Sequence, residues 1–173
     1  MASTLRTGKT MRSKQLKASQ IIQNAYTITE LVLAVAIIGI LSSVAIPSYV
    51  GQLCRSESAE AESTVSVIKT IITSYIDETD TLPTSWDELS DISAIMSNNG
   101  IAKGNFKGTT VTLPSENYAV AVQGPTDNTY EITATQIDGC ENRDIRACID
   151  ISNGASDLRR GDGSTNAQDP ICS

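Results

Sequence analysis

The 173-residue sequence contains no histidine, and aromatic residues make up only 4% of it. Without histidine the chain lacks the commonest general base, the commonest metal ligand and any Ser/His or Cys/His nucleophile pair. One Trp and one Phe are too few for a platform on which bases or sugars stack. The composition therefore argues against an enzyme and predicts no bound cofactor.

Positive charge is scarce beyond residue 25. The chain has 13 Lys and Arg against 20 Asp and Glu, and five of the cations precede residue 26, where there is no acid: Arg6, Lys9, Arg12, Lys14 and Lys17. The remainder has 13 − 5 = 8 basic against 20 acidic residues, a formal charge of −12. Because phosphate binding requires clustered Lys and Arg, we expect no direct nucleic-acid binding by the bulk surface.

One segment near the N-terminus is long and apolar enough to span a membrane. Residues 31–46 carry no charge and would form about 24 Å of helix, which flanking residues 26–28 and 49–50 extend to the thickness of a bilayer core. The upstream cations would hold the N-terminus in the cytoplasm. A secretory signal cleaved near residues 42–45 is the alternative, but helical periodicity continues past Pro47.

The residues after Pro47 have the spacing of an amphipathic helix. Steps of four and three residues connect one apolar face: Cys54, Ser58, Ala61, Val65, Ile68, Ile72 and Tyr75. We predict a helix from Tyr26 to about Asp77 whose second half packs on a globular partner. Ser85 and Glu88 have the spacing of a capping box, which predicts a short helix from there to about Ser97.

The rest of the chain reads as a small antiparallel sheet. Three runs have strand-like alternation, residues 109–113, 118–123 and 129–137, with a turn at 124–128 between the last two. Residues 146–151 are a fourth candidate strand, and residues 152–173 are expected to be irregular. We therefore predict an α+β fold in which the apolar half of a long helix protrudes and its amphipathic half packs on the sheet.

Three short motifs in the first helix resemble the N-terminus of type IV pilins and type II secretion pseudopilins. They are Ala-Tyr-Thr-Ile-Thr-Glu-Leu at 25–31, Ala-Ile-Ile-Gly-Ile-Leu at 36–41 and Ala-Ile-Pro at 45–47. The resemblance implies the pilin "lollipop" fold and cleavage by a prepilin peptidase between Ala25 and Tyr26. It also implies N-methylation of Tyr26. Residues 1–25 would then be a cleaved basic leader, 26–50 a transmembrane and filament-core helix, and 51–173 an amphipathic helix with its globular head.

Glu30 is the one acid at the start of the apolar run. Together with Gly39 and Pro47, it is a candidate for a role in assembly. A carboxylate in an apolar helix requires a partner, and cleavage before Tyr26 would create a cationic amine four residues upstream, on the same or a neighbouring subunit. The alternative is that Glu30 only reaches the membrane interface. Gly39 would permit close helix contact, and Pro47 would kink or loosen the helix.

The four cysteines are expected to form disulfides outside the cytoplasm. Pilins often have a C-terminal disulfide loop, which implies Cys148–Cys172 and leaves Cys54–Cys140. The other scheme pairs Cys140 with Cys148 and Cys54 with Cys172. Some pseudopilins hold calcium in this region, and the candidates are Asp157, Asp162 and Asp169. A solvated acidic loop is the favoured interpretation there, so no metal is predicted.

These observations favour a structural subunit of a type IV pilus, made as a bacterial inner-membrane prepilin and polymerised through its N-terminal helix. Adhesion, motility or DNA uptake would be the role of the extracellular filament. The implied partners are copies of itself, other pilins, the prepilin peptidase and the pilus assembly machinery. A minor pilin or a periplasmic pseudopilin is the alternative, and an anchored enzyme or binding module is a remote one.

Overall fold

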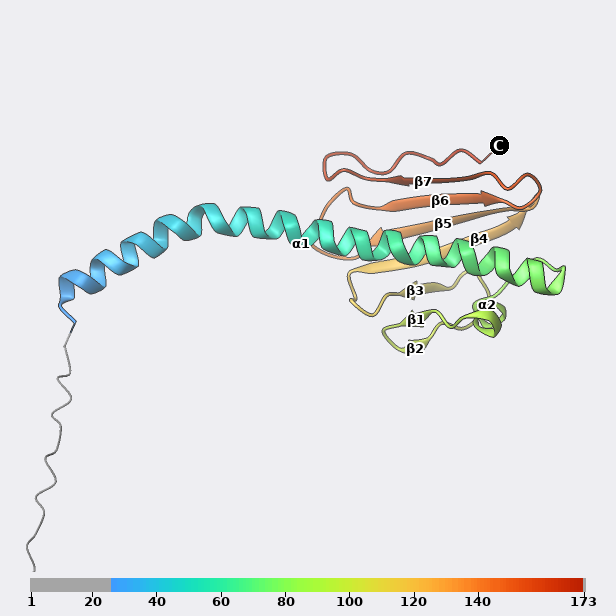
Figure 1. The fold of residues 1–173 in the computed structure, drawn as a ribbon, viewed down its shortest axis with the longest axis horizontal. Coiled ribbons are helices and arrows are strands. Elements are labelled where there is room, and N and C mark those ends of the chain that lie inside the picture. Colours follow the sequence, from blue (N-terminus) through green and yellow to red (C-terminus); the bar gives the residue numbers. More distant parts are fainter. Residues whose placement is uncertain (1–25, 173) are drawn as a thin grey trace, which may run out of the picture. The chain divides into compact units, whose positions relative to one another are not determined.

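A computed structural model describes residues 26–172, apart from the side chain of Pro47 (Figure 1). The first element is the helix α1, Ile28–Thr79, which is 52 residues long. By backbone contacts the chain divides into two units, one up to Ser42 and one from Ser43 onward. The helix runs through both units, and α1 extends two residues beyond the predicted end at Asp77.

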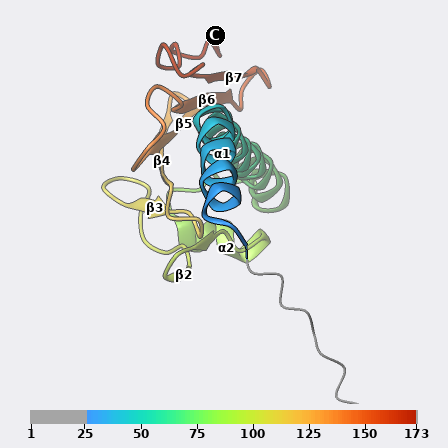
Figure 2. The same cartoon turned by 90° about the vertical axis from the view of Figure 1, so that its left-hand side faces the viewer.

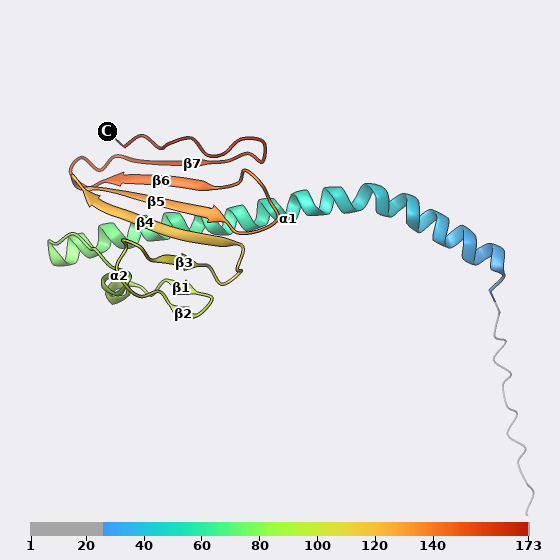
Figure 3. The ribbon, with the colours of Figure 1, turned by 180° about the vertical axis from the view of Figure 1, so that it is seen from behind.

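The second unit contains a five-stranded antiparallel sheet in the order β3-β4-β5-β6-β7 (Figure 3). Every neighbouring pair is adjacent in sequence as well as in space, so the sheet is a simple meander. The strands are β3, Thr110–Thr112; β4, Tyr118–Thr126; β5, Thr129–Gln136; β6, Ile145–Asp150; and β7, Ser156–Arg160. The four predicted strands are confirmed to within a few residues.

The second half of α1 packs across one face of this sheet (Figure 2). The predicted apolar face of the helix is buried from Cys54 to Ile72, and Tyr75 packs against the core from its margin. Alternate residues of the strands supply the opposing layer: Val111, Tyr118, Val120, Val122, Tyr130, Ile132, Ala134, Ile145, Ala147 and Ile149. The α+β class and the packing of the amphipathic half on the sheet are therefore confirmed.

Two buried tyrosines of the sheet donate hydrogen bonds to neighbouring loops. Tyr130 Oη donates to the carbonyl of Pro83 at 2.9 Å, and Tyr118 Oη donates to the carbonyl of Arg143 at 3.0 Å. Burial raises the pKa of both phenols, which therefore stay protonated donors. Each bond satisfies a hydroxyl that would otherwise be costly to bury.

The short helix α2, Trp86–Ile92, begins at the predicted capping box. Glu88 N–H donates to Ser85 Oγ, and Glu88 Oε2 accepts from the backbone N–H groups of Thr84 and Ser85. The hydrogen bonds to the Glu88 carboxylate lower its pKa, and the bond from the Thr84 backbone N–H has the largest effect. Trp86 is fully buried and meets Phe106 edge-to-face, with ring centroids 5.4 Å apart.

The predicted extension of this helix to Ser97 is wrong. Ser93 is extended and caps the helix by donating to the Leu89 carbonyl, and Ile95 is then buried in the core. The chain continues as a two-stranded hairpin of β1, Met96–Ser97, and β2, Gly100–Ile101. Gly100 has φ 108°, a left-handed conformation that glycine adopts without steric cost. Burial of Ile95 and the Asn-Asn-Gly turn therefore prevail over helical periodicity.

The expectation of an irregular C-terminal region is wrong in one part, because β7 extends the sheet by pairing with β6. After β7 the chain turns back, and Asp carboxylates hold it in place by accepting hydrogen bonds from its backbone. Asp157 accepts from the backbone N–H of Ile171 at 3.0 Å and from Arg159 Nε at 2.8 Å. Asp162 accepts from the backbone N–H groups of Ser164 and Thr165, at 2.7 and 2.8 Å.

We expect this C-terminal region to loosen in acid. The backbone N–H of Ile171 lowers the pKa of Asp157, and that of Thr165 lowers the pKa of Asp162. Because the folded pKa values lie below the ordinary 3.8, the stabilisation is complete above that pH and is lost as the pH falls through the folded values. Hydrogen-exchange protection of the Ile171 amide should decrease between pH 5 and pH 2.5, relative to that of Val120.

Asp157→Asn is the matched control for this prediction. The amide cannot ionise, so the variant should show weaker Ile171 protection at pH 5 and little further change on acidification. Equal protection of the Ile171 amide at both pH values in the unsubstituted chain would contradict the assignment.

Candidate functional site on the N-terminal helix

Glu30 takes part in a capping box at the start of α1. Thr27 is the residue before the helix, and its backbone N–H and Oγ1 both lie 2.9 Å from Glu30 Oε2. In return, the Glu30 N–H donates to Thr27 Oγ1 at 3.2 Å. Thr27 and Glu30 therefore satisfy each other's polar groups at a helix end where backbone donors lack partners.

This local partner for Glu30 was missed in the sequence, although its pattern was present. Thr27-Ile28-Thr29-Glu30 is a Thr-x-x-Glu pattern directly before an apolar run, which is typical of a helix N-terminus. The carboxylate also lies in the first turn of the helix, where the backbone dipole favours negative charge. The predicted pairing of Glu30 with an N-terminal amine stays a prediction.

The apolar part of α1 presents its side chains outward. No residue in its most apolar 18-residue stretch is buried, and by length and composition this helix can cross a membrane. Leu31, Ile38 and Val44 are 62%, 61% and 71% exposed. An exposed apolar surface of this extent marks a membrane or protein contact.

No contact within its own unit explains why residue 39 is a glycine. A Cβ built on this residue would meet nothing within 4 Å, whereas glycine in a helix interior costs roughly 0.5–1 kcal/mol relative to alanine. A contact outside the subunit, such as a close approach by another helix, would account for it. Pro47 lies inside α1, to which it contributes no backbone N–H. Ala25 and the predicted leader, residues 1–25, lie outside the described residues.

Two disulfides cross-link the head, and the cysteines pair as in the first of the two predicted schemes. Cys54 of α1 bonds to Cys140 in the β5–β6 loop, and Cys148 of β6 bonds to Cys172 near the C-terminus. Cys54 lies on the buried face of α1, so its bond joins the helix directly to the loop between two inner strands of the sheet. The second disulfide holds the C-terminal segment against β6.

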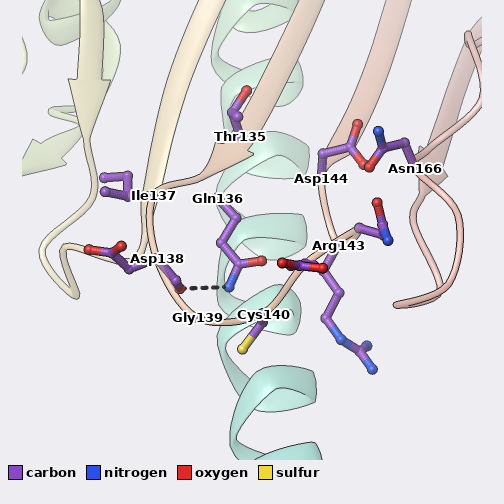
Figure 4. Close-up of a pocket in the computed structure, with 11 residues that line it drawn as sticks. Thr135, Gln136, Ile137, Asp138, Gly139, Cys140, Arg143, Asp144 and Asn166 are labelled. Atoms are coloured by element: carbon purple, nitrogen blue, oxygen red, sulfur yellow. Dashed lines mark hydrogen bonds between the residues drawn. The ribbon is translucent and has the colours of Figure 1, made fainter.

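A shallow hollow of about 310 Å³ lies beside Cys140 (Figure 4). Most of the residues that line it are of polar types, among them Gln136, Arg143, Asp144 and Asn166. Gln136 Nε2 donates to the Asp138 carbonyl at 3.0 Å. The cysteine there is already in a disulfide, and no lining side chain is a base paired with a free nucleophile.

The three candidate calcium ligands each interact with different partners. Asp157 and Asp162 accept the backbone bonds described above, and Asp169 forms an ion pair with Arg146. Within residues 26–172, no group of three or more Cys, Asp or Glu side chains is placed to hold a metal ion. Asp162 instead closes its own turn, as Asp side chains commonly do.

An exposed apolar helix with one N-terminal acid, continuing into a helix packed on an antiparallel meander, defines an α+β pilin-like fold. The chain is similar to two fimbrial proteins of Pseudomonas aeruginosa, with 44% identity over 54 residues in each case. That match covers 31% of this chain and 35% of each relative, so it spans about a third of their length.

A longer match is to the fimbrial protein EcpC of Eikenella corrodens, 29% identical over 111 residues. It covers 61% of this chain and 72% of that protein. No protein-family model matches the chain, and no solved structure matches it. The similarities support a protein of the fimbrial type.

Proposed function

We propose that this chain is a structural subunit of a type IV pilus. It is inserted in the bacterial inner membrane as a prepilin, cleaved between Ala25 and Tyr26, methylated on the Tyr26 amine and polymerised through α1. The observation that carries the proposal is the placement of Glu30 at the start of a helix whose most apolar 18-residue stretch contains no buried residue. The similarity to fimbrial proteins supports it.

The chemistry follows from the cost of moving this helix between environments. In the membrane the apolar side chains contact lipid, and in a filament they contact the same helix of other copies. Glu30 is too costly to transfer into a helical bundle without a cation. The amine exposed by cleavage before Tyr26 supplies that cation, so assembly depends on prior processing.

The test is to shear surface filaments from cells that express the chain and to analyse them by electron microscopy and mass spectrometry. The expected result is abundant recovery of a chain that begins at methylated Tyr26. Absence from sheared filaments, with retention in the membrane fraction, would contradict the proposal and favour a minor pilin or a pseudopilin.

Gly39→Ala is expected to impair filament assembly without affecting the single subunit. The added methyl group has open space within the subunit, so membrane insertion and chain abundance should be unchanged. Filament yield should fall, because the methyl group would enter a close helix–helix contact. Gly51→Ala is the matched control, since Gly51 also lies on α1 with nothing within 4 Å of its Cβ position.

Unchanged filament yield in Gly39→Ala would contradict the assignment of Gly39 to a contact between subunits. A fall in chain abundance in the membrane would instead place its effect within the subunit.

A further inference from the structure

In the proposed prepilin, the part of α1 just after the apolar run lies at the level of the lipid headgroups. Residues 31–50 contain no charge, and a helix of this length measures about 30 Å, the thickness of a bilayer core. Each headgroup layer adds about 5–8 Å, which corresponds to residues 51–55. Tyr49 and Arg55 suit this boundary, because tyrosine is enriched at membrane interfaces and a long arginine side chain reaches the phosphates.

The Cys54–Cys140 disulfide holds one loop of the head at the same level. The Cα atoms of Cys54 and Cys140 are 5.6 Å apart. Cys140 belongs to the β5–β6 loop, residues 137–144, which lies at one end of the sheet beside α1 (Figures 1 and 3). Ile137 is three residues from Cys140, so the two Cα atoms lie within about 11 Å of each other. The loop is therefore placed next to the headgroup layer.

This loop exposes an aliphatic side chain toward its surroundings. Ile137 is 46% exposed, although its backbone N–H is fixed by donation to the Asn117 carbonyl at 2.9 Å. On α1, Leu53 is 45% exposed, and Tyr49 and Val50 are exposed as well. Exposed apolar side chains mark an interaction surface, and these lie where a membrane-spanning helix leaves the bilayer.

The charged groups of this region are of both signs and lack partners. Arg55, Asp138 and Glu141 are exposed, and none of them forms an ion pair with another residue between 26 and 172. Because the acids outnumber the cation, an anionic lipid surface would repel the region. A zwitterionic phospholipid instead offers its phosphate to Arg55 and its ammonium group to the two carboxylates.

We propose that the head binds a zwitterionic phospholipid headgroup layer before the subunit enters a filament. Ile137 inserts among the headgroups, and the Cys54–Cys140 disulfide sets its depth. This inference rests on the proposed function, which places α1 in a membrane, and it assigns a second lipid contact outside that helix. The membrane-proximal surface that makes the contact consists of Tyr49, Val50, Leu53, Arg55 and residues 137–141.

The direct test places a photoreactive benzoylphenylalanine at Ile137 in the full chain, reconstituted in phosphatidylcholine vesicles. Irradiation should give a product whose mass is increased by one phospholipid. The same substitution at Ile171, 67% exposed, is the control and should give little lipid product. Ile171 bonds to Asp157 near the start of β7, whereas the β5–β6 loop lies at the other end of that strand. A lipid yield at position 137 no higher than at position 171 would overturn the proposal.

Benzoylphenylalanine at Leu53 separates this proposal from the proposed function, because it should label lipid whenever α1 is inserted. Lipid labelling at position 53 with none at position 137 would overturn the loop contact and leave the membrane-inserted subunit in place. Absence of labelling at both positions would overturn the insertion of α1, on which both proposals depend. Each variant should retain the emission of the buried Trp86, which reports on folding of the head.

Lipid charge provides a second test. Replacing phosphatidylcholine by phosphatidylglycerol should lower the lipid product at Ile137 about fivefold, the scale of one charge near an anionic surface, and leave the product at Leu53 unchanged. Asp138→Asn combined with Glu141→Gln should restore the yield at position 137 in phosphatidylglycerol. Equal yields at position 137 from the two lipids in the unsubstituted loop would overturn the assignment to a zwitterionic layer.

Discussion

Glu30→Gln is expected to leave the chain in the membrane at its usual abundance and to reduce filament yield by at least about tenfold, the scale expected when a desolvated charge pair loses one partner. Glutamine serves as well as glutamate at the third position of a capping box. The variant therefore keeps the bonds to Thr27 and removes only the charge. The measurement is the ratio of this chain in sheared filaments to that in membranes.

Two companion variants separate charge pairing from helix capping. Thr27→Val removes the hydroxyl that contacts both the N–H and Oε2 of Glu30 and keeps the carboxylate, so we expect it to assemble nearly normally. Glu30→Val removes both functions and should match Glu30→Gln. If Glu30→Gln assembles normally and Thr27→Val does not, Glu30 acts as a cap and the pairing with the amine is wrong.

Removing the Cys54–Cys140 disulfide is expected to destabilise the head more than removing Cys148–Cys172. The bonds span 86 and 24 residues, which corresponds to about 4–5 and about 3–4 kcal/mol in the chain-entropy description. The longer loop also contains most of the sheet. The comparison is between the double variants Cys54→Ala/Cys140→Ala and Cys148→Ala/Cys172→Ala, each free of unpaired thiols.

Trp86 makes this measurement possible in the full chain, because it is the only tryptophan and is fully buried. Its emission during urea unfolding in detergent should give a lower midpoint for the Cys54→Ala/Cys140→Ala variant. An equal or higher midpoint for that variant would contradict the prediction. Non-reducing peptide mapping of the unsubstituted chain is the independent check, and a Cys140–Cys148 peptide would show that the pairing is wrong.

The strands and the packed half of α1 were predictable because their signals are local. Burial repeats every three to four residues from Cys54 to Tyr75 and every second residue in β4 and β5, and these periods are those of the backbone itself. The prediction failed where a tertiary contact prevails over a local pattern. Residues 93–97 have helical spacing, but burial of Ile95 and the turn at Gly100 make them extended.

In the candidate site, the residues were predicted from the sequence, but the local partner of Glu30 was overlooked. Glu30, Gly39 and Pro47 stand out because each is unusual inside an apolar helix. The bond between Glu30 and Thr27 is local and was available from the Thr-x-x-Glu pattern.

The sequence alone determined the apolar half of the long helix, its single acid and four of the five strands of the main sheet, since each depends on spacing within one short segment. The tertiary structure decided which cysteines pair, because four cysteines allow three pairings until the fold brings Cys54 to Cys140 and Cys148 to Cys172. It also decided that β7 pairs with β6 and that Val67 and Met96 line the same hollow. These features join residues distant in sequence, and only packing determines which distant residues meet.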